Sequence, residues 1–224
     1  MTTAPTATTA AEREAQRTFW PTMPPSPLLH AKPRGVAWAC EIQAQLLPRE
    51  RLFLYATIMA KAPMRVLEIG AYEGYSSSII DMALRDLGAN GRLVSVDPAP
   101  CLDFDWEDRF DDRASLVRRP SPDGLSEALE RSGGPFEFVF VDGDHEYEGV
   151  LADLRGVAEV TAPDALIVLH DAYYEPLQRA CMDALAEGLP YIDAGIVCTT
   201  ENAGSEYGRD VSYCGLRMLR RTGA

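Results

Sequence analysis

Positive charge is scarce in this sequence, where 21 lysines and arginines stand against 34 aspartates and glutamates and leave a net charge of −13. Proteins that bind nucleic acid or an anionic membrane meet the phosphates with patches of lysine and arginine. The basic pairs Arg118-Arg119 and Arg220-Arg221 are too short to form such a patch. We therefore expect neither nucleic acid nor a membrane as a partner.

Long apolar runs and ordered cysteine spacings are missing as well. No stretch approaches the ~20 apolar residues of a membrane-spanning helix. Residues 1–20 contain Glu12 and Glu14 but no apolar core, so no secretory signal is visible. The five cysteines are scattered without a C-x-x-C pair, which excludes the usual zinc spacings and indicates reduced thiols. We expect a cytoplasmic protein.

The N-terminal part of the chain differs in composition from the rest. Residues 1–11 are rich in threonine and alanine, and residues 21–33 are dense in proline, which favours an extended segment. We interpret residues 1–35 as a flexible tail and a lid that closes over a bound substrate, with help from a second subunit in a homodimer. The alternatives are a structural segment or an inert tail. Residues 36–224 are then one domain, which opens with helices over 36–63.

Strand-like apolar runs and helical segments alternate regularly after this N-terminal part. We predict strands at residues 65–69, 92–97, 114–117, 137–142 and 165–169, and helices at 76–87, 123–131, 147–160 and 176–187. Two further strands are expected at 191–199 and 211–219, joined by a polar loop. The alternation predicts an α/β fold with a doubly wound, mostly parallel sheet. Ligands of such sheets bind beyond the carboxyl ends of the strands.

The most informative stretch is residues 66–78, where an apolar run leads into Glu68 and is followed by Gly70, Gly74 and a run of serines. An apolar run that ends in a glycine turn is typical of a buried parallel strand that feeds a helix. The glycines let the backbone approach a ligand closely, and the helix offers free amide groups in its first turn. Glu68 would repel a phosphate but suits a cationic amino-acid group, a combination that fits S-adenosylmethionine.

The segment Glu68-Ile69-Gly70-Ala71-Tyr72-Glu73-Gly74-Tyr75-Ser76 resembles the first motif of class I S-adenosylmethionine-dependent methyltransferases, in the catechol O-methyltransferase-like branch. The resemblance implies a seven-stranded, Rossmann-like sheet closed by an antiparallel hairpin. A nicotinamide site is the competing interpretation, but it requires glycine in place of Tyr72 and an acid ~20 residues on, whereas Asp97 lies further away. A strand-to-helix turn without a ligand is the remaining alternative.

Polar groups after the next two strands extend the expected cofactor site. Asp97 follows the second strand, where the resemblance implies an acid that accepts both ribose hydroxyls. Ser121 follows the third strand, where relatives contact adenine, although a serine before a helix is also an ordinary N-cap. The expected cofactor-binding residues are Glu68, Gly70, Ala71, Tyr72, Gly74, Ser76, Asp97, Ser121 and Asp142.

Carboxylates also follow two neighbouring strands, with Asp142 after the fourth and Asp171 after the fifth. Facing carboxylates repel one another unless a cation lies between them, and Mg²⁺ prefers oxygen ligands. The resemblance implies that both residues ligate a divalent metal, but relatives have asparagine where this chain has Ala172. His170 is then a candidate third ligand, whose nitrogen would suit Mn²⁺ or another transition metal better than Mg²⁺. A metal-free site remains open.

His145 is the candidate catalytic residue. It lies three residues after Asp142, where the resemblance implies a basic group beside the attacking hydroxyl, and a histidine can act as a general base near neutral pH. The stretch that starts at Asp142 also resembles bacterial methyltransferases that modify sugars and antibiotic scaffolds. We therefore expect an O-methyltransferase for a small molecule, such as a phenol, a sugar or a natural-product hydroxyl. The alternatives are a metal-free N-methyltransferase and a non-catalytic or hydroxylase-associated relative.

Overall fold

The computed structural model describes residues 46–88, 90–199, 202–206 and 209–223, with the backbone alone described for 202–206 and 209–211. All of them belong to the second of two compact units, Gly35–Ala224, and the first unit is Met1–Arg34. The expected tail and lid therefore lie outside the described residues. So does the start of the predicted N-terminal helices, of which the structure describes α4 (Pro48–Lys61).

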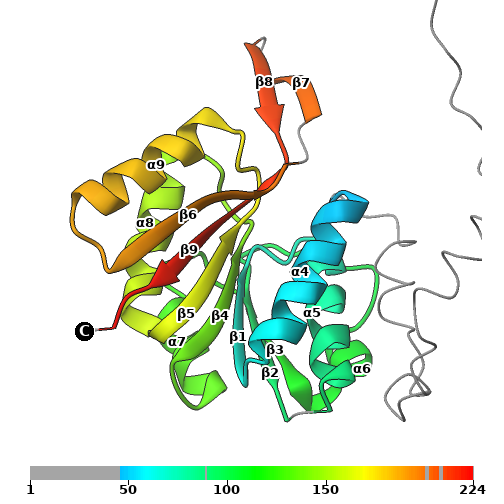
Figure 1. Ribbon diagram of the computed structural model, residues 1–224. Coiled ribbons are helices and arrows are strands. Elements are labelled where there is room, and N and C mark those ends of the chain that lie inside the picture. The colour runs from blue at the N-terminus through cyan, green and yellow to red at the C-terminus, as the bar shows by residue number, and fades with distance from the viewer. Residues whose placement is uncertain (1–45, 89, 200–201, 207–208, 224) are drawn as a thin grey trace, which may run out of the picture. The chain divides into compact units, whose positions relative to one another are not determined.

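A seven-stranded sheet forms the centre of the second unit (Figure 1). In spatial order its strands are β3 (Ala114–Val117), β2 (Arg92–Val96), β1 (Arg65–Ile69), β4 (Phe136–Val141), β5 (Thr161–Leu169), β9 (Leu216–Arg221) and β6 (Tyr191–Cys198). The first five run parallel, and β9 runs antiparallel to both β5 and β6. The predicted doubly wound, mostly parallel seven-stranded sheet is thus confirmed.

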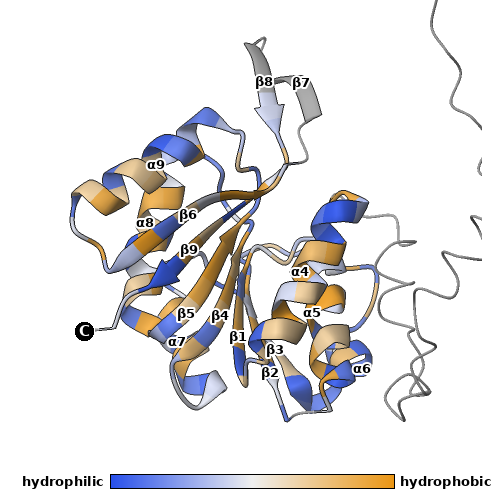
Figure 2. Ribbon diagram, in the orientation of Figure 1, coloured by the Kyte–Doolittle hydropathy of each residue, from blue (hydrophilic) through white to orange (hydrophobic). Residues whose placement is uncertain are grey.

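Helices cover both faces of this sheet (Figure 1). One face packs against α4, α5 (Tyr75–Asp86) and α6 (Trp106–Phe110), and the other against α7 (Leu125–Ser132), α8 (Tyr147–Val160) and α9 (Glu175–Ala186). In Figure 2 the ribbon colours show hydrophobic residues (orange) concentrated on the central strands and on parts of the helices that cover them. Among the described residues, no helix combines the length and the apolarity needed to cross a membrane.

The central strand β4 shows why the sheet is buried on both sides. Phe138 and Phe140 contribute to the apolar cluster under α4 and α5, while Val139 and Val141 contribute to the cluster under α7, α8 and α9. Successive side chains of a strand point to opposite faces, so an unbroken apolar run serves both layers. Each fully buried phenylalanine stabilises the fold by about 1.5–3 kcal/mol.

The end of the chain differs from the prediction of one strand over 211–219. Residues 209–213 instead form β8 (Arg209–Tyr213), which pairs with β7 (Asn202–Glu206) in a separate two-stranded hairpin (Figure 1). Cys214 and Gly215 have φ angles of +63° and +76°, and this break lets β9 begin at Leu216 in the main sheet. Strands cannot continue through two left-handed residues.

Candidate functional site

A cavity of about 530 Å³ opens beyond the carboxyl ends of β1, β2, β3 and β4, in the part of the chain that the structure describes. Most of the predicted cofactor-binding residues line it: Gly70, Ala71, Tyr72, Ser76, Asp97, Ser121 and Asp142. His145 lines it as well, whereas Glu68 and Gly74 do not. The rule that ligands bind at the carboxyl edge of a parallel sheet therefore places the cavity correctly.

The loop between β1 and α5 depends on two glycines. Gly70 has a φ of +88°, and a Cβ atom there would lie 2.1 Å from the carbonyl oxygen of Asp142. Gly74 has a φ of +79° at the N-cap of α5, and a Cβ atom there would lie 2.6 Å from the ring of Phe104. Both positions combine a left-handed backbone with close packing, which only glycine tolerates.

Asp97 fixes the same loop from the end of β2. Its Oδ2 accepts hydrogen bonds from the backbone N–H groups of Ala71 at 3.0 Å and Tyr72 at 2.8 Å, and its Oδ1 accepts one from Ala99 at 2.8 Å. A carboxylate has about four acceptor positions, so capacity remains for a ligand. Asp97 therefore shapes the cavity wall while it also lines the cavity.

Glu68 lies beneath the cavity wall and is fully buried. Its Oε2 accepts hydrogen bonds from the hydroxyls of Ser77 and Ser95, each at 2.5 Å, and its Oε1 has no hydrogen-bond partner among the described residues. Burial raises the pKa of Glu68 to about 7, although the hydroxyls of Ser76, Ser77 and Ser95 lower it. Because Ser76 lines the cavity, Glu68 can influence a ligand through the serines but does not reach the cavity itself.

Replacing Glu68 by glutamine should change how stability depends on pH. The pKa of Glu68 is higher in the folded protein, so its contribution to stability is present at low pH and is lost as pH rises from about 4.5 to 7. Between pH 5 and pH 8 the wild type should lose about 2 kcal/mol through this group, and Glu68→Gln should not. Urea unfolding of both proteins at the two pH values measures the difference. If the free energy of unfolding changed equally with pH in both proteins, the raised pKa of Glu68 would be contradicted.

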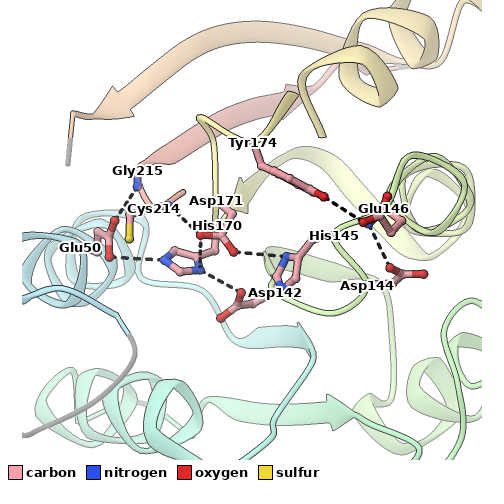
Figure 3. A network of polar contacts seen from close by, with 10 residues as sticks. All are labelled: Glu50, Asp142, Asp144, His145, Glu146, His170, Asp171, Tyr174, Cys214 and Gly215. Carbon is pink, nitrogen blue, oxygen red and sulfur yellow. Dashed lines mark hydrogen bonds and ion pairs between the residues drawn. The ribbon is translucent and has the colours of Figure 1, made fainter. Parts of the chain in front are cut away.

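His170, directly after β5, is held between two carboxylates (Figure 3). Its Nδ1 lies 2.9 Å from Oδ1 of Asp142, and its Nε2 lies 3.3 Å from Oε2 of Glu50. Burial lowers the pKa of His170, but the charge and hydrogen bond of Asp142, with Glu50 and Asp171, outweigh it and hold the pKa well above its usual value. The imidazole is therefore charged and donates to both sides at neutral pH.

Glu50 is the member of this cluster that the sequence did not reveal. It lies in the first turn of α4 and is fully buried. Its Oε1 accepts a hydrogen bond from the backbone N–H of Gly215 at 2.6 Å, and its Oε2 accepts one from the N–H of Leu47 at 2.7 Å. An acid in a first helical turn is common, so the sequence could not separate Glu50 from an ordinary cap.

Asp171 connects the buried cluster to the cavity. Its backbone has a φ of +54°, and its Oδ1 accepts a hydrogen bond from the N–H of Cys214 at 2.7 Å. Its Oδ2 lies 3.3 Å from Nδ1 of His145, whose side chain is 42 % exposed (Figure 3). A carboxylate at Nδ1 orients the ring and leaves Nε2 of His145 for a ligand in the cavity.

The donor set of Asp142, His170 and Asp171 fits a small divalent cation. One ligand atom from each of the three residues lies within 4.8 Å of the others, and two carboxylates balance the charge of such an ion. Ala172 is buried and offers no ligand atom, so the asparagine ligand of relatives has no equivalent at that position. The nitrogen of His170 widens the choice to transition metals. A cation there would replace the proton on Nδ1 of His170, and with it the hydrogen bond between His170 and Asp142.

The other acids after β4 turn away from this cluster. Glu146 accepts a hydrogen bond from the hydroxyl of Tyr174 at 2.8 Å, and its backbone N–H donates to Oδ1 of Asp144 at 2.9 Å (Figure 3). These contacts fix the start of α8. Of this acidic stretch, Asp142 and His145 are the residues that join the site around His170 and Asp171.

Comparisons with known proteins agree with this architecture. Residues 67–172 match the model of a family described as a methyltransferase domain. No curated protein matches the chain. Solved structures with the same fold include the O-methyltransferase TomG from Streptomyces achromogenes, involved in tomaymycin synthesis and in complex with S-adenosylmethionine (20% identity, TM-score 0.54, covering 86% of this chain and 91% of that one).

Two further structures cover almost the whole of both chains. The O-methyltransferase from Bacillus cereus in complex with S-adenosylhomocysteine is 16% identical with a TM-score of 0.55, and the alignment covers 96% of this chain and 98% of that one. The S-adenosylhomocysteine-bound methyltransferase PaMTH1 from Podospora anserina is 15% identical with a TM-score of 0.57, covering 98% and 100%. At such identities the likeness establishes the fold.

Proposed function

We propose that this chain, whose residues 67–172 match a methyltransferase domain, is a class I S-adenosylmethionine-dependent methyltransferase that methylates a hydroxyl group of a small molecule. One observation carries the proposal. The cavity joins the Gly70 loop, which suits the cofactor, to the exposed side of His145, whose other ring nitrogen is held by Asp171. A nucleophile activated by an oriented base is what transfer to oxygen requires.

The cofactor would lie along the carboxyl edge of the sheet. Gly70, Ala71, Tyr72 and Ser76 surround its amino-acid part, Asp97 receives the ribose hydroxyls, and Ser121 adjoins the adenine. Asp142 closes the wall on the side of β4. In this arrangement the sulfonium would lie between the Gly70 loop and His145. Its positive charge suits a cavity wall that carries Asp97, Asp142 and Asp144.

The reaction would be an in-line displacement at the methyl carbon. The acceptor oxygen forms the new bond to the methyl carbon while the carbon–sulfur bond breaks. The electron pair of the carbon–sulfur bond stays on sulfur, so the sulfonium becomes a neutral thioether. Nε2 of His145 takes the proton of the acceptor hydroxyl, and Asp171 stabilises the resulting imidazolium. Holding donor and acceptor in line contributes the rest of the rate enhancement.

A divalent cation is part of the proposal. Asp142, His170 and Asp171 would hold it, and it would lower the pKa of the acceptor hydroxyl and orient it. Glu50 accepts from Nε2 of His170, which fixes the ring so that Nδ1 faces Asp142. Mg²⁺ and Mn²⁺ are the candidates. A metal-free reaction is the second candidate, because both oxygens of Asp171 already have protein partners.

The test combines binding and turnover on the full-length protein. S-adenosylhomocysteine should raise the melting temperature, and S-adenosylmethionine should methylate members of a panel of phenols and hydroxylated natural products. Treatment with EDTA should lower turnover at least about tenfold, and Mg²⁺ or Mn²⁺ should restore it. Full activity in EDTA would leave the methyl transfer standing and exclude the metal. Absence of S-adenosylhomocysteine binding would contradict the proposed function as a whole.

A further inference from the structure

Three buried side chains with metal-binding atoms meet on the side of His170 that faces away from Asp142. They are Glu50 in α4, His170 after β5 and Cys214 between β8 and β9. One ligand atom from each lies within 4.8 Å of the others, and their exposed fractions are 0 %, 6 % and 7 %. Figure 3 shows the sulfur of Cys214 beside the carboxyl group of Glu50 and the Nε2 side of the His170 ring. The chemistry proposed above gives Cys214 no role.

The distance between His170 and Glu50 suits two ligands of one ion better than a hydrogen bond. A charge-assisted N–H···O bond is usually about 2.7–2.9 Å long. The contact of Nδ1 with Asp142 has that length, at 2.9 Å, whereas Nε2 lies 3.3 Å from Oε2 of Glu50. Nitrogen and oxygen ligands of a tetrahedral zinc ion lie roughly 3.3–3.6 Å from each other. The pair is therefore already spaced for such an ion.

The other contacts of His170 and Glu50 are those that metal ligands need. A metal-bound histidine usually donates its second ring N–H to a carboxylate, which fixes the tautomer and the ring, and Asp142 accepts from Nδ1 here. Oε1 of Glu50 accepts from the N–H of Gly215, and its Oε2 accepts from the N–H of Leu47. Each carboxylate oxygen has a second lone pair, so these bonds can persist beside a metal ion. Both ligands are thus oriented by the protein.

The backbone holds the thiol of Cys214 in this cluster. Cys214 has a φ of +63°, in the left-handed region that residues other than glycine seldom adopt. Its N–H donates to Oδ1 of Asp171 at 2.7 Å, which fixes the turn between β8 and β9. A strained backbone persists where its surroundings or its function require it. At this turn it brings the sulfur to Glu50 and His170.

We propose that Glu50, His170 and Cys214 form a zinc site that joins α4, the end of β5 and the start of β9. Zinc binds thiolate, imidazole and carboxylate, and a thiolate does not suit Mg²⁺. Binding releases the proton of the thiol and the proton of Nε2, so that a thiolate and a carboxylate balance the charge of Zn²⁺. Three protein ligands leave the fourth position to a water molecule. Glu50 and His170 are 120 residues apart in the chain, so no zinc spacing is visible in the sequence.

This zinc site and the proposed cation site of Asp142 and Asp171 share one imidazole. Zinc on Nε2 leaves the proton on Nδ1, which then donates to Asp142 and cannot bind a second ion. A cation between Asp142 and Asp171 would then be held without His170. The methyl transfer itself does not require zinc, so the two proposals succeed or fail separately.

The test uses Co²⁺ as a spectroscopic substitute for Zn²⁺, on the full-length protein after treatment with EDTA and removal of the chelator. Co²⁺ bound to a thiolate gives a charge-transfer band in the near ultraviolet, which carboxylates and imidazole alone do not give. The wild type should show this band and lose it when Zn²⁺ displaces Co²⁺. Cys214→Ser should not show the band. Cys101→Ser, which changes an exposed thiol outside the cluster, should keep it.

Asp142→Asn separates this site from the cation site of Asp142 and Asp171. The amide oxygen still accepts the proton of Nδ1, so the variant should keep the charge-transfer band, while its affinity for the ion falls about 10–100-fold. If the band disappears in Asp142→Asn at a saturating concentration of Co²⁺, the ion does not lie where we propose.

Two further results would overturn the inference. One is a wild type without the charge-transfer band, and the other is a band that survives in Cys214→Ser, because another thiol would then hold the ion. If Cys214→Ser does not fold, X-ray absorption at the zinc edge of the wild type decides. One sulfur at about 2.3 Å supports the site, and the absence of sulfur refutes it. Binding of S-adenosylhomocysteine by the same samples tests the proposed function independently.

Discussion

Replacing His145 by alanine is expected to lower kcat by about 10²–10⁴-fold, the usual contribution of a general base. The binding of S-adenosylhomocysteine should change less than about threefold, because the Gly70 loop and Asp97 remain. The expectation follows from the contact of Nδ1 with Asp171, which leaves Nε2 as the group that faces the cavity. Steady-state kinetics with an accepted substrate and calorimetry with S-adenosylhomocysteine separate the two effects.

Glu146→Gln is the matched control for this variant. Glu146 adjoins His145 in the chain, but it bonds to Tyr174 and does not line the cavity. Its replacement should leave kcat within about threefold of the wild type, since it touches no reacting group. If His145→Ala retains wild-type kcat, proton transfer must occur elsewhere and the pair with Asp171 is structural.

Replacing Gly70 by alanine is expected to abolish cofactor binding and to destabilise the fold by about 3–5 kcal/mol. The new Cβ would lie 2.1 Å from the backbone carbonyl oxygen of Asp142, and the φ of +88° adds strain for any L-residue. To relieve this steric clash, β1 and β4 must separate at the edge of the sheet where the cavity opens. Urea unfolding and calorimetry with S-adenosylhomocysteine measure the two losses.

Gly88→Ala is the control that separates the effect of backbone strain from the effect of the steric clash with Asp142. Gly88 also has a left-handed φ, +64°, but a Cβ atom there would meet nothing within 4 Å. Its replacement should cost about 1 kcal/mol and leave cofactor affinity unchanged. Similar losses for the two alanine variants would mean that the contact with Asp142 is not what requires glycine at position 70.

Local patterns in the sequence predict most of the fold. The bounds of β1, β3 and α8 agree with the prediction, because apolar strands, glycine turns and helical periodicity depend on neighbouring residues. The break between β8 and β9 was not predictable in this way. Cys214 takes a positive φ, which a cysteine rarely does, so no local signal marks it.

Glu68 and Glu50 make buried contacts that the sequence alone did not predict. On β1, Leu67 and Ile69 point to one face of the sheet, so Glu68 points to the other, where the hydroxyls of Ser77 and Ser95 bury its carboxyl. The motif alone did not reveal these partners. Glu50 contacts Gly215, 165 residues later in the chain, and a separation of that length leaves no trace in local spacing.

The order in which the chain is synthesised differs from the order of its strands in the sheet. β6 leaves the ribosome before β9, yet β9 inserts between β5 and β6. The same late segment brings the amides of Cys214 and Gly215 to the carboxylates of Asp171 and Glu50. A nascent chain that ends before residue 214 therefore carries every candidate side chain of the site, but two of its buried carboxylates lack these backbone donors. A chain released at that point would contain every sequence motif of the site, but the cluster of Glu50, His170 and Asp171 would not be assembled.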